Sequence, residues 1–129
     1  MNQELLDRYI AIERAIAELK GQPFRLFAVL GERDSPSGWE IVVSVDWENA
    51  SKRDIIETIG NEMRKQFVRQ DYVSFSRIRV LDPSSPTVAT IARQCKVNRE
   101  VAVMQSINIQ GLIYDGYIIA TSQRDLVVV

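Results

Sequence analysis

The apolar residues of this chain repeat with two different spacings, and the order in which these alternate constrains the fold more than any other feature. In residues 3–20 the apolar residues recur at steps of four and three, which places them on one face of an α-helix. Gly21 and Pro23 follow as a helix cap and a stop. The residues of this stripe are Leu5, Tyr9, Ile12, Ile16 and Leu19. We expect the stripe to pack on the protein's own sheet, the alternative being a helical contact between two copies of the chain.

Strand spacing follows this helix. Residues 24–31 are apolar on both alternating faces, which is typical of an inner strand, and residues 39–47 are expected to form a β-hairpin with them. A third strand is expected at residues 72–81. The second strand places a single row of large side chains on one face, which must be the buried one: Trp39, Ile41, Val43, Val45 and Trp47.

The C-terminal third is also rich in strand signals. Residues 101–109 alternate imperfectly, with Val101, Val103, Ile107 and Ile109 on one side. Within residues 112–121 the pair Asp115–Gly116 predicts a two-residue hairpin turn. Tyr114 and Tyr117 flank this pair and are expected to face each other across it. The terminal LVVV is expected to be a further strand, exposed at an edge unless it pairs.

Helical spacing returns in two further segments. Residues 51–69 begin with Ser51 and Asp54 at capping-box spacing, and residues 86–96 follow Ser85 as a cap with Pro86 in the first turn. The element order αββαβαβββ predicts an α+β fold: a mostly antiparallel sheet of five or six strands, with about three helices packed on one face. With 129 residues, the chain is expected to form a single domain over residues 1–129.

The composition of the chain excludes several classes of function and gives little positive indication of one. The formal net charge is −1, so no global field attracts the chain to nucleic acid or to anionic lipid. The N-terminal residues are polar and no apolar run is long enough for a membrane span, so a cytoplasmic location and no membrane contact are expected. The single cysteine, Cys95, is consistent with a reducing compartment and is expected to be a packed thiol.

The chain has no histidine, which excludes several classes of active site. Catalytic triads, histidine general bases and histidine-containing zinc sites cannot form. Thiolate zinc sites are excluded as well, because there is only one cysteine. No cofactor is expected, and the balance favours a protein without catalytic activity.

Two carboxylates stand at the end of the second expected strand. Asp46 and Glu48 lie two residues apart and would point the same way from a strand, as the ligands of a Mg²⁺-dependent nucleotidyl or phosphoryl transferase do. No Walker-type loop accompanies them, and their place just before a helix suits negative charge. The interpretation favoured by the sequence is structural carboxylates, with metal binding as an alternative.

Positive charge is concentrated in the middle of the chain. Residues 61–99 contain 8 basic and 3 acidic side chains, whereas residues 1–60 contain 7 basic and 11 acidic ones. Two of the bases, Arg77 and Arg79, project from one side of an expected strand near a helix start. Free N–H groups at a helix start suit an anion, and arginine binds anions bidentately. The candidate anion- or partner-binding set is Arg77, Arg79, Ser84, Ser85 and Thr87. The favoured alternative is that these arginines pair with Glu40, Asp46 and Glu48 across the sheet.

Residues 87–104, TVATIARQCKVNREVAVM, resemble the helix-turn-helix of bacterial regulators. Thr87, the pair Ile91–Ala92 and the run from Val97 to Arg99 hold the characteristic places. Residues 111–121 resemble the wing that follows such helices in winged-helix proteins. The resemblance implies DNA binding, with a recognition helix within residues 98–108. The side chains that it assigns to DNA are Arg93, Lys96, Asn98, Arg99 and Gln105. Intrinsic preference instead favours a strand in this interval, because its residues are β-branched and alternating.

The function favoured by the sequence is therefore that of a small binding module without catalytic activity, which binds a protein partner or a second copy of itself. Homodimer formation would use the helix of residues 3–20 or the C-terminal strand. DNA binding through residues 87–121 is the first alternative, and a metal-dependent transferase using Asp46 and Glu48 is the second.

Overall fold

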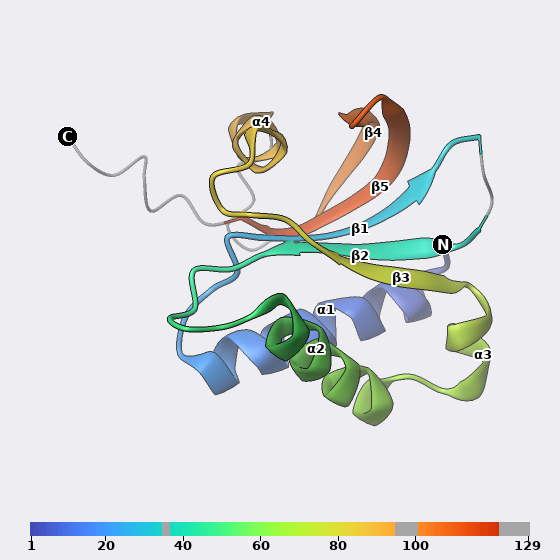
Figure 1. Ribbon diagram of the computed structural model, residues 1–129. Helices are drawn as coiled ribbons and strands as arrows, with labels where there is room; N and C mark the ends of the chain where they lie inside the picture. Colours follow the sequence, from blue (N-terminus) through green and yellow to red (C-terminus); the bar gives the residue numbers. More distant parts are fainter. Residues whose placement is uncertain (35–36, 95–100, 122–129) are drawn as a thin grey trace.

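The fold is an α+β sandwich of a single mixed sheet with helices on both faces (Figure 1). A computed structural model describes residues 1–34, 37–94 and 101–121. The strand order is β3-β2-β1-β5-β4, in which only the β2–β3 pair is parallel among the described strands. The elements are α1 (Gln3–Lys20), β1 (Leu26–Glu32), β2 (Trp39–Ser44), α2 (Lys52–Gln66), α3 (Arg69–Val73), β3 (Phe75–Val80), α4 (Pro86–Gln94), β4 (Ala102–Ile109) and β5 (Leu112–Thr121).

Local capping fixes the two long helices where the sequence predicts them. The side chain of Asn2 accepts a hydrogen bond from the N–H of Leu5 at the start of α1, and Gly21 ends the helix in the left-handed conformation. Ser51 and Asp54 form the expected capping box at the start of α2. The apolar stripe of α1 is buried in the protein's own core apart from Leu19, so the prediction that it packs internally is confirmed.

The helices cover both faces of the sheet, not one. Helices α1, α2 and α3 lie on one face and α4 lies alone on the other (Figure 1). The central strands require this, because β1 is apolar on both sides and β2 is buried on both sides. Phe27 and Val29 of β1 point into the core beneath α1 and α2, whereas Ala28 and Leu30 point into a second core with α4. A sheet that is buried on both faces must have helices packed on both faces.

The third strand begins later than the sequence predicts. Residues 69–73 form the short helix α3, and β3 starts only at Phe75. The carboxylate of Asp71 favours this turn because it accepts hydrogen bonds from the N–H of Val68 and from the guanidinium of Arg8 on α1. A contact 63 residues away in sequence therefore decides the local structure here.

The predicted turn at Asp115–Gly116 is wrong. Both residues lie inside β5, and the hairpin turn is formed by Gln110 and Gly111, whose φ values are 54° and 86°. These positive values are those of a type I′ turn. Gly116 is needed for a different reason: a Cβ at this position would collide with the carbonyl oxygen of Val29 on β1.

The expected pairing of two tyrosines fails for the same reason. Tyr114 and Tyr117 lie on one strand and point to opposite faces of the sheet. Tyr114 is fully buried on the α4 side, and Tyr117 packs against Trp39 with ring centroids 6.0 Å apart. The predicted terminal strand at residues 126–129 and the position of Cys95 fall outside the described residues. No helix of the described chain is long and apolar enough to cross a membrane.

Candidate binding groove

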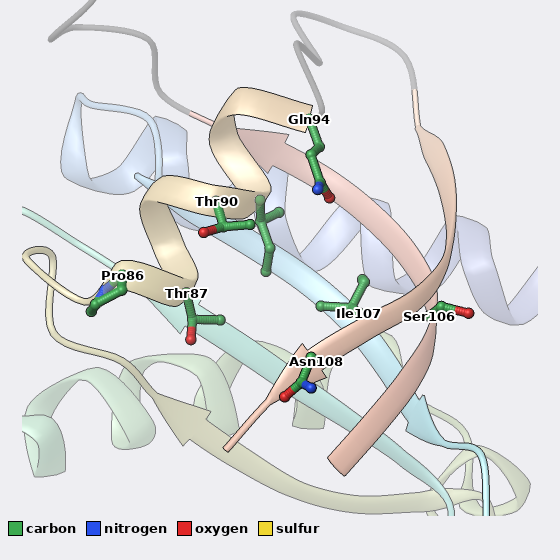
Figure 2. A pocket seen from close by; sticks show the side chains of 8 residues that line it. Pro86, Thr87, Thr90, Gln94, Ser106, Ile107 and Asn108 are labelled. Atoms are coloured by element: carbon green, nitrogen blue, oxygen red, sulfur yellow. The ribbon is translucent and has the colours of Figure 1, made fainter. Parts of the chain in front are cut away.

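A groove of about 370 Å³ separates α4 from the edge strand β4 (Figure 2). Apolar side chains contribute to it from both sides, Ile91 from α4 and Ile107 from β4. The rest of the lining is uncharged and capable of hydrogen bonding, apart from Pro86. The lining residues are Pro86, Thr87, Thr90, Ile91, Gln94, Ser106, Ile107 and Asn108. Such a groove suits an uncharged ligand with both apolar and hydrogen-bonding groups.

Helix α4 forms one wall because its two faces differ. The buried residues Val88 and Ile91 hold it against the sheet. Thr87, Thr90 and Gln94 recur at helical spacing on the side that lines the groove (Figure 2). The helix starts as the sequence predicts, since Ser85 Oγ accepts a hydrogen bond from the N–H of Thr87 at 3.3 Å.

Strand β4 forms the other wall and is interrupted there by a β-bulge. Its register against β5 shifts between Met104 and Ile107, and Ser106 has a φ of 58°, in the left-handed region. Asp115 Oδ1 accepts a hydrogen bond from the N–H of Ser106 at 2.9 Å. Arg33 holds that carboxylate through two hydrogen bonds of 3.0 and 2.6 Å and donates a third, of 2.8 Å, to Ser106 Oγ. We call this group of Arg33, Asp115 and Ser106 the bulge clamp.

The bulge clamp is ionic over a wide pH range. The hydrogen bonds from Arg33 and from the N–H of Ser106 lower the pKa of Asp115 to about 2. Asp115 therefore remains a carboxylate at any pH at which the protein is expected to work. The hydrogen bonds to Asp115 in turn raise the pKa of the Arg33 guanidinium.

Backbone groups of β4 point away from the sheet beside the groove. The N–H of Arg33 donates to the carbonyl of Ile113, so the polar backbone groups of Ile113 point toward β1 and away from β4. Its partner on β4 is Asn108, and the two form a non-hydrogen-bonded pair. The N–H and C=O of Asn108 consequently point outward, along an edge where no other strand of the described chain pairs. The Asn108 side chain is occupied by the N–H of Gly111.

Arg77 and Arg79 are engaged by a buried carboxylate on the α4 side of the sheet. Glu40 is 6% exposed and accepts a hydrogen bond of 2.5 Å from Arg77 Nε, with Arg79 Nη2 at 3.6 Å. Arg79 also donates to Tyr114 Oη at 3.1 Å, which ties β3 to β5 across two intervening strands. The hydrogen bond to Glu40 raises the pKa of Arg77. The alternative favoured by the sequence was pairing of these arginines with Glu40, Asp46 and Glu48. It is confirmed for Glu40, whereas Asp46 pairs with Arg25.

The serines of the predicted anion-binding set have local partners of their own. Both the N–H and the hydroxyl of Ser84 donate to Asp82, whose pKa these bonds lower, and Ser85 caps α4. Thr87 is the only member of the set that lines the groove among the described residues. Anion binding by these five residues stays a prediction.

Of the two carboxylates after β2, Asp46 has a structural contact, and Glu48 is exposed. Asp46 forms an ion pair of 3.3 Å with Arg25. In the described ranges of the chain, no three acidic, histidine or cysteine side chains gather closely enough to hold a metal ion. Both tryptophans of this strand region pack against the α1–α2 core, as expected.

The structure has a strand where the helix-turn-helix resemblance implies a recognition helix. Residues 102–109 are β4, so the described part of that interval has the alternative, strand conformation. Arg93 is exposed near the end of α4 and Gln105 is exposed at the bulge. The other three side chains assigned to DNA, Lys96, Asn98 and Arg99, lie outside the described residues.

A second hollow, of about 550 Å³, lies between the start of α1 and α3. Its charged groups satisfy one another, because Arg8 bridges Glu4 at 3.0 Å and Asp71 at 2.9 Å. The α4–β4 groove differs in offering backbone groups of Asn108 with which no described strand pairs. Sequence reasoning missed the residues that shape this groove, Ser106, Asn108, Arg33 and Asp115. The only available signal was the Asp115–Gly116 pair, and it was interpreted as a turn.

Comparison of the chain with protein-family models, with curated proteins and with solved structures finds no match.

Proposed function

We propose that the protein is a binding module without catalytic activity that takes up an extended segment of a partner protein along the free edge of β4, in the groove beside α4. The observation that carries this proposal is the outward direction of the Asn108 backbone N–H and C=O. An extended peptide can pair with such groups as an added strand, with the groove receiving its side chains. In this mode of binding, hydrogen bonds between the backbones provide the affinity, and pockets for the side chains provide the sequence specificity.

The composition of the groove supports an uncharged segment. None of the described side chains that line it is charged, so a Lys, Arg, Asp or Glu side chain buried there would lose its hydration without gaining a partner among them. Ile91 and Ile107 favour an apolar, β-branched side chain between them, whereas the hydroxyl and amide groups of α4 favour Ser, Thr or Asn on either side.

A cytoplasmic location is part of the proposal. It is supported by the single cysteine, since a chain that works in an oxidising compartment gains stability from disulfide pairs.

The test is a titration of the ¹⁵N-labelled protein with a library of uncharged five-residue peptides, capped at both ends and varied at the three central positions. We expect chemical-shift changes at groove residues of α4 and β4. Asn108→Pro removes the outward N–H without removing a bond of the β4–β5 ladder, so it should abolish binding. Asn108→Ala keeps that N–H and should still bind.

Two results would overturn the proposal. One is the absence of any shift at the groove for every peptide of the library. The other is equal binding by Asn108→Pro and the wild type, with the β4–β5 shifts showing that the variant is folded.

A further inference from the structure

The first half of β4 could pack on the sheet in two ways. Residues 101–104 read Val-Ala-Val-Met and are apolar on both alternating sides. In the structure Ala102 and Met104 pack into the α4-side core, and Val103 points outward with 69% of its surface exposed. A slip of one residue would exchange these two sets and would bury Val103 instead. The apolar pattern of this segment therefore does not fix its register.

The bulge clamp fixes the register of the first half of β4. Beyond the bulge, Ile107 and Ile109 are buried and face the same core as Ala102 and Met104. Strict alternation would put Val101 and Val103 on that side, and the extra residue at the bulge is what reverses the first half of the strand. The left-handed Ser106 is unfavourable for a residue with a Cβ. The four hydrogen bonds among Arg33, Asp115 and Ser106 offset that cost.

We infer that Arg33 and Asp115 lock the register of β4, and that the locked bulge makes its edge accept a short uncharged segment of another protein while refusing β4 of a second copy. The part of this inference that concerns the partner rests on the proposed function. Because the bulge divides the free edge, a straight partner strand can pair in one register only with the residues beyond it, near Asn108.

Exclusion of a second copy is needed because no other protection of β4 is found among the described residues. The strand from Ala102 to Ile109 contains no charged residue, whereas exposed edges are commonly guarded by lysine, proline or a bulge. Without the bulge, two copies of this uncharged edge could pair antiparallel about a two-fold axis with no repulsion between them.

The experiment measures the oligomeric state and the β4–β5 register of three proteins in parallel: the wild type, Asp115→Ala, and Glu48→Ala as a control with the same change in charge. Light scattering after size exclusion gives the mass, and cross-strand NOEs give the register. We expect the wild type and Glu48→Ala to be monomers, with Met104 opposite Gly116. Asp115→Ala should lose that register and become a dimer or larger. Adding Asn108→Pro to Asp115→Ala should restore the monomer.

Two outcomes would overturn the inference without touching the proposed function. A monomeric Asp115→Ala with Met104 still opposite Gly116 would show that the clamp does not set the register. A wild-type dimer that Asn108→Pro dissociates would show that the edge does accept its own copy. Should Asp115→Ala fail to fold, Arg33→Gln, which leaves the Asp115–Ser106 bond in place, is measured in its stead with the same expectations. The proposed function fails separately, in the peptide titration.

Discussion

At the scale of single residues, burial determines how much a carboxylate contributes to the stability of the fold. Glu40 is almost fully buried between two arginines, whereas Glu48 is exposed at the end of the same strand region. Removal of Glu40 leaves Arg79, whose side chain is 18% exposed, desolvated without this partner, whereas Arg77 is 55% exposed and stays hydrated. We expect Glu40→Ala to lower the free energy of unfolding by about 1–3 kcal/mol.

Urea denaturation checks this expectation, with Glu48→Ala as the matched control. The control should change the free energy of unfolding by less than about 0.5 kcal/mol, as surface substitutions usually do. Equal effects of the two substitutions would mean that the Glu40 cluster contributes nothing to stability beyond an ordinary surface charge.

The pKa of Asp115 predicts how the bulge clamp responds to acid. The pKa in the folded protein is about 2, below the ordinary value of 3.8. A lowered pKa means that the folded state holds the proton more weakly than the unfolded state, so the stabilisation is complete above the ordinary value and is lost as the pH falls toward about 2. The difference in urea midpoint between the wild type and Asp115→Asn should be constant from neutral pH down to about the ordinary pKa. It should then shrink, and a difference that already shrinks near neutral pH would contradict the assigned ion pair.

At the scale of elements, replacement of two glycines by alanine should have opposite effects on stability. Gly116 lies in β5 where a Cβ would strike the backbone of β1, so Gly116→Ala should lower the free energy of unfolding by more than about 2 kcal/mol. Gly60 lies in α2 with only the end of the Arg64 side chain near the added Cβ, at 3.9 Å. Gly60→Ala should raise the free energy of unfolding by about 0.5–1 kcal/mol, because alanine favours the helix. Thermal unfolding of the two variants checks both signs, and a stable Gly116→Ala would contradict the close approach of β1 and β5.

The elements that the sequence predicts correctly are those set by local patterns. The stripe of α1, the capping box of α2 and the Ser85–Pro86 start of α4 are each encoded within a few residues, and all three are confirmed. The errors occur where a distant contact decides the structure. Arg8 stabilises the turn at Asp71 from 63 positions away, and Arg33 holds Asp115 from 82 positions away.

The candidate groove was largely unpredictable for the same reason. Thr87 could be singled out because it follows a helix cap, but Asn108 becomes important only through the register of β4 against β5. That register depends on a β-bulge, which leaves no clear mark in the pattern of apolar residues. The extra residue at the bulge makes the alternation look imperfect. Strict alternation therefore predicts that Val103 is buried, whereas it is exposed.

At the scale of the whole molecule, the two cores share the same central strands. Both tryptophans pack against the core beneath α1 and α2, whereas Ile91 of α4 is 1% exposed in the core on the opposite face. Strands β1 and β2 contribute side chains to both cores. Loss of the helices on one face would therefore expose buried side chains of the same strands that support the other core. We therefore expect the described sheet and its helices to unfold as one cooperative unit, as the predicted single domain implies.

Ile91→Ala tests this cooperativity, because the substitution and the fluorescent probes lie on opposite faces of the sheet. Loss of the buried side chain should lower the free energy of unfolding by about 2–4 kcal/mol. The urea midpoints from tryptophan emission and from far-UV circular dichroism should then fall together, and Thr90→Ala, at an exposed position of the same helix, should leave both nearly unchanged. If α4 instead detached alone, the circular dichroism would change first while the tryptophan midpoint stayed at its wild-type value. The sheet would then behave as a stable platform for α1 and α2, and the wall that α4 gives to the groove would be a separately folding part of the molecule.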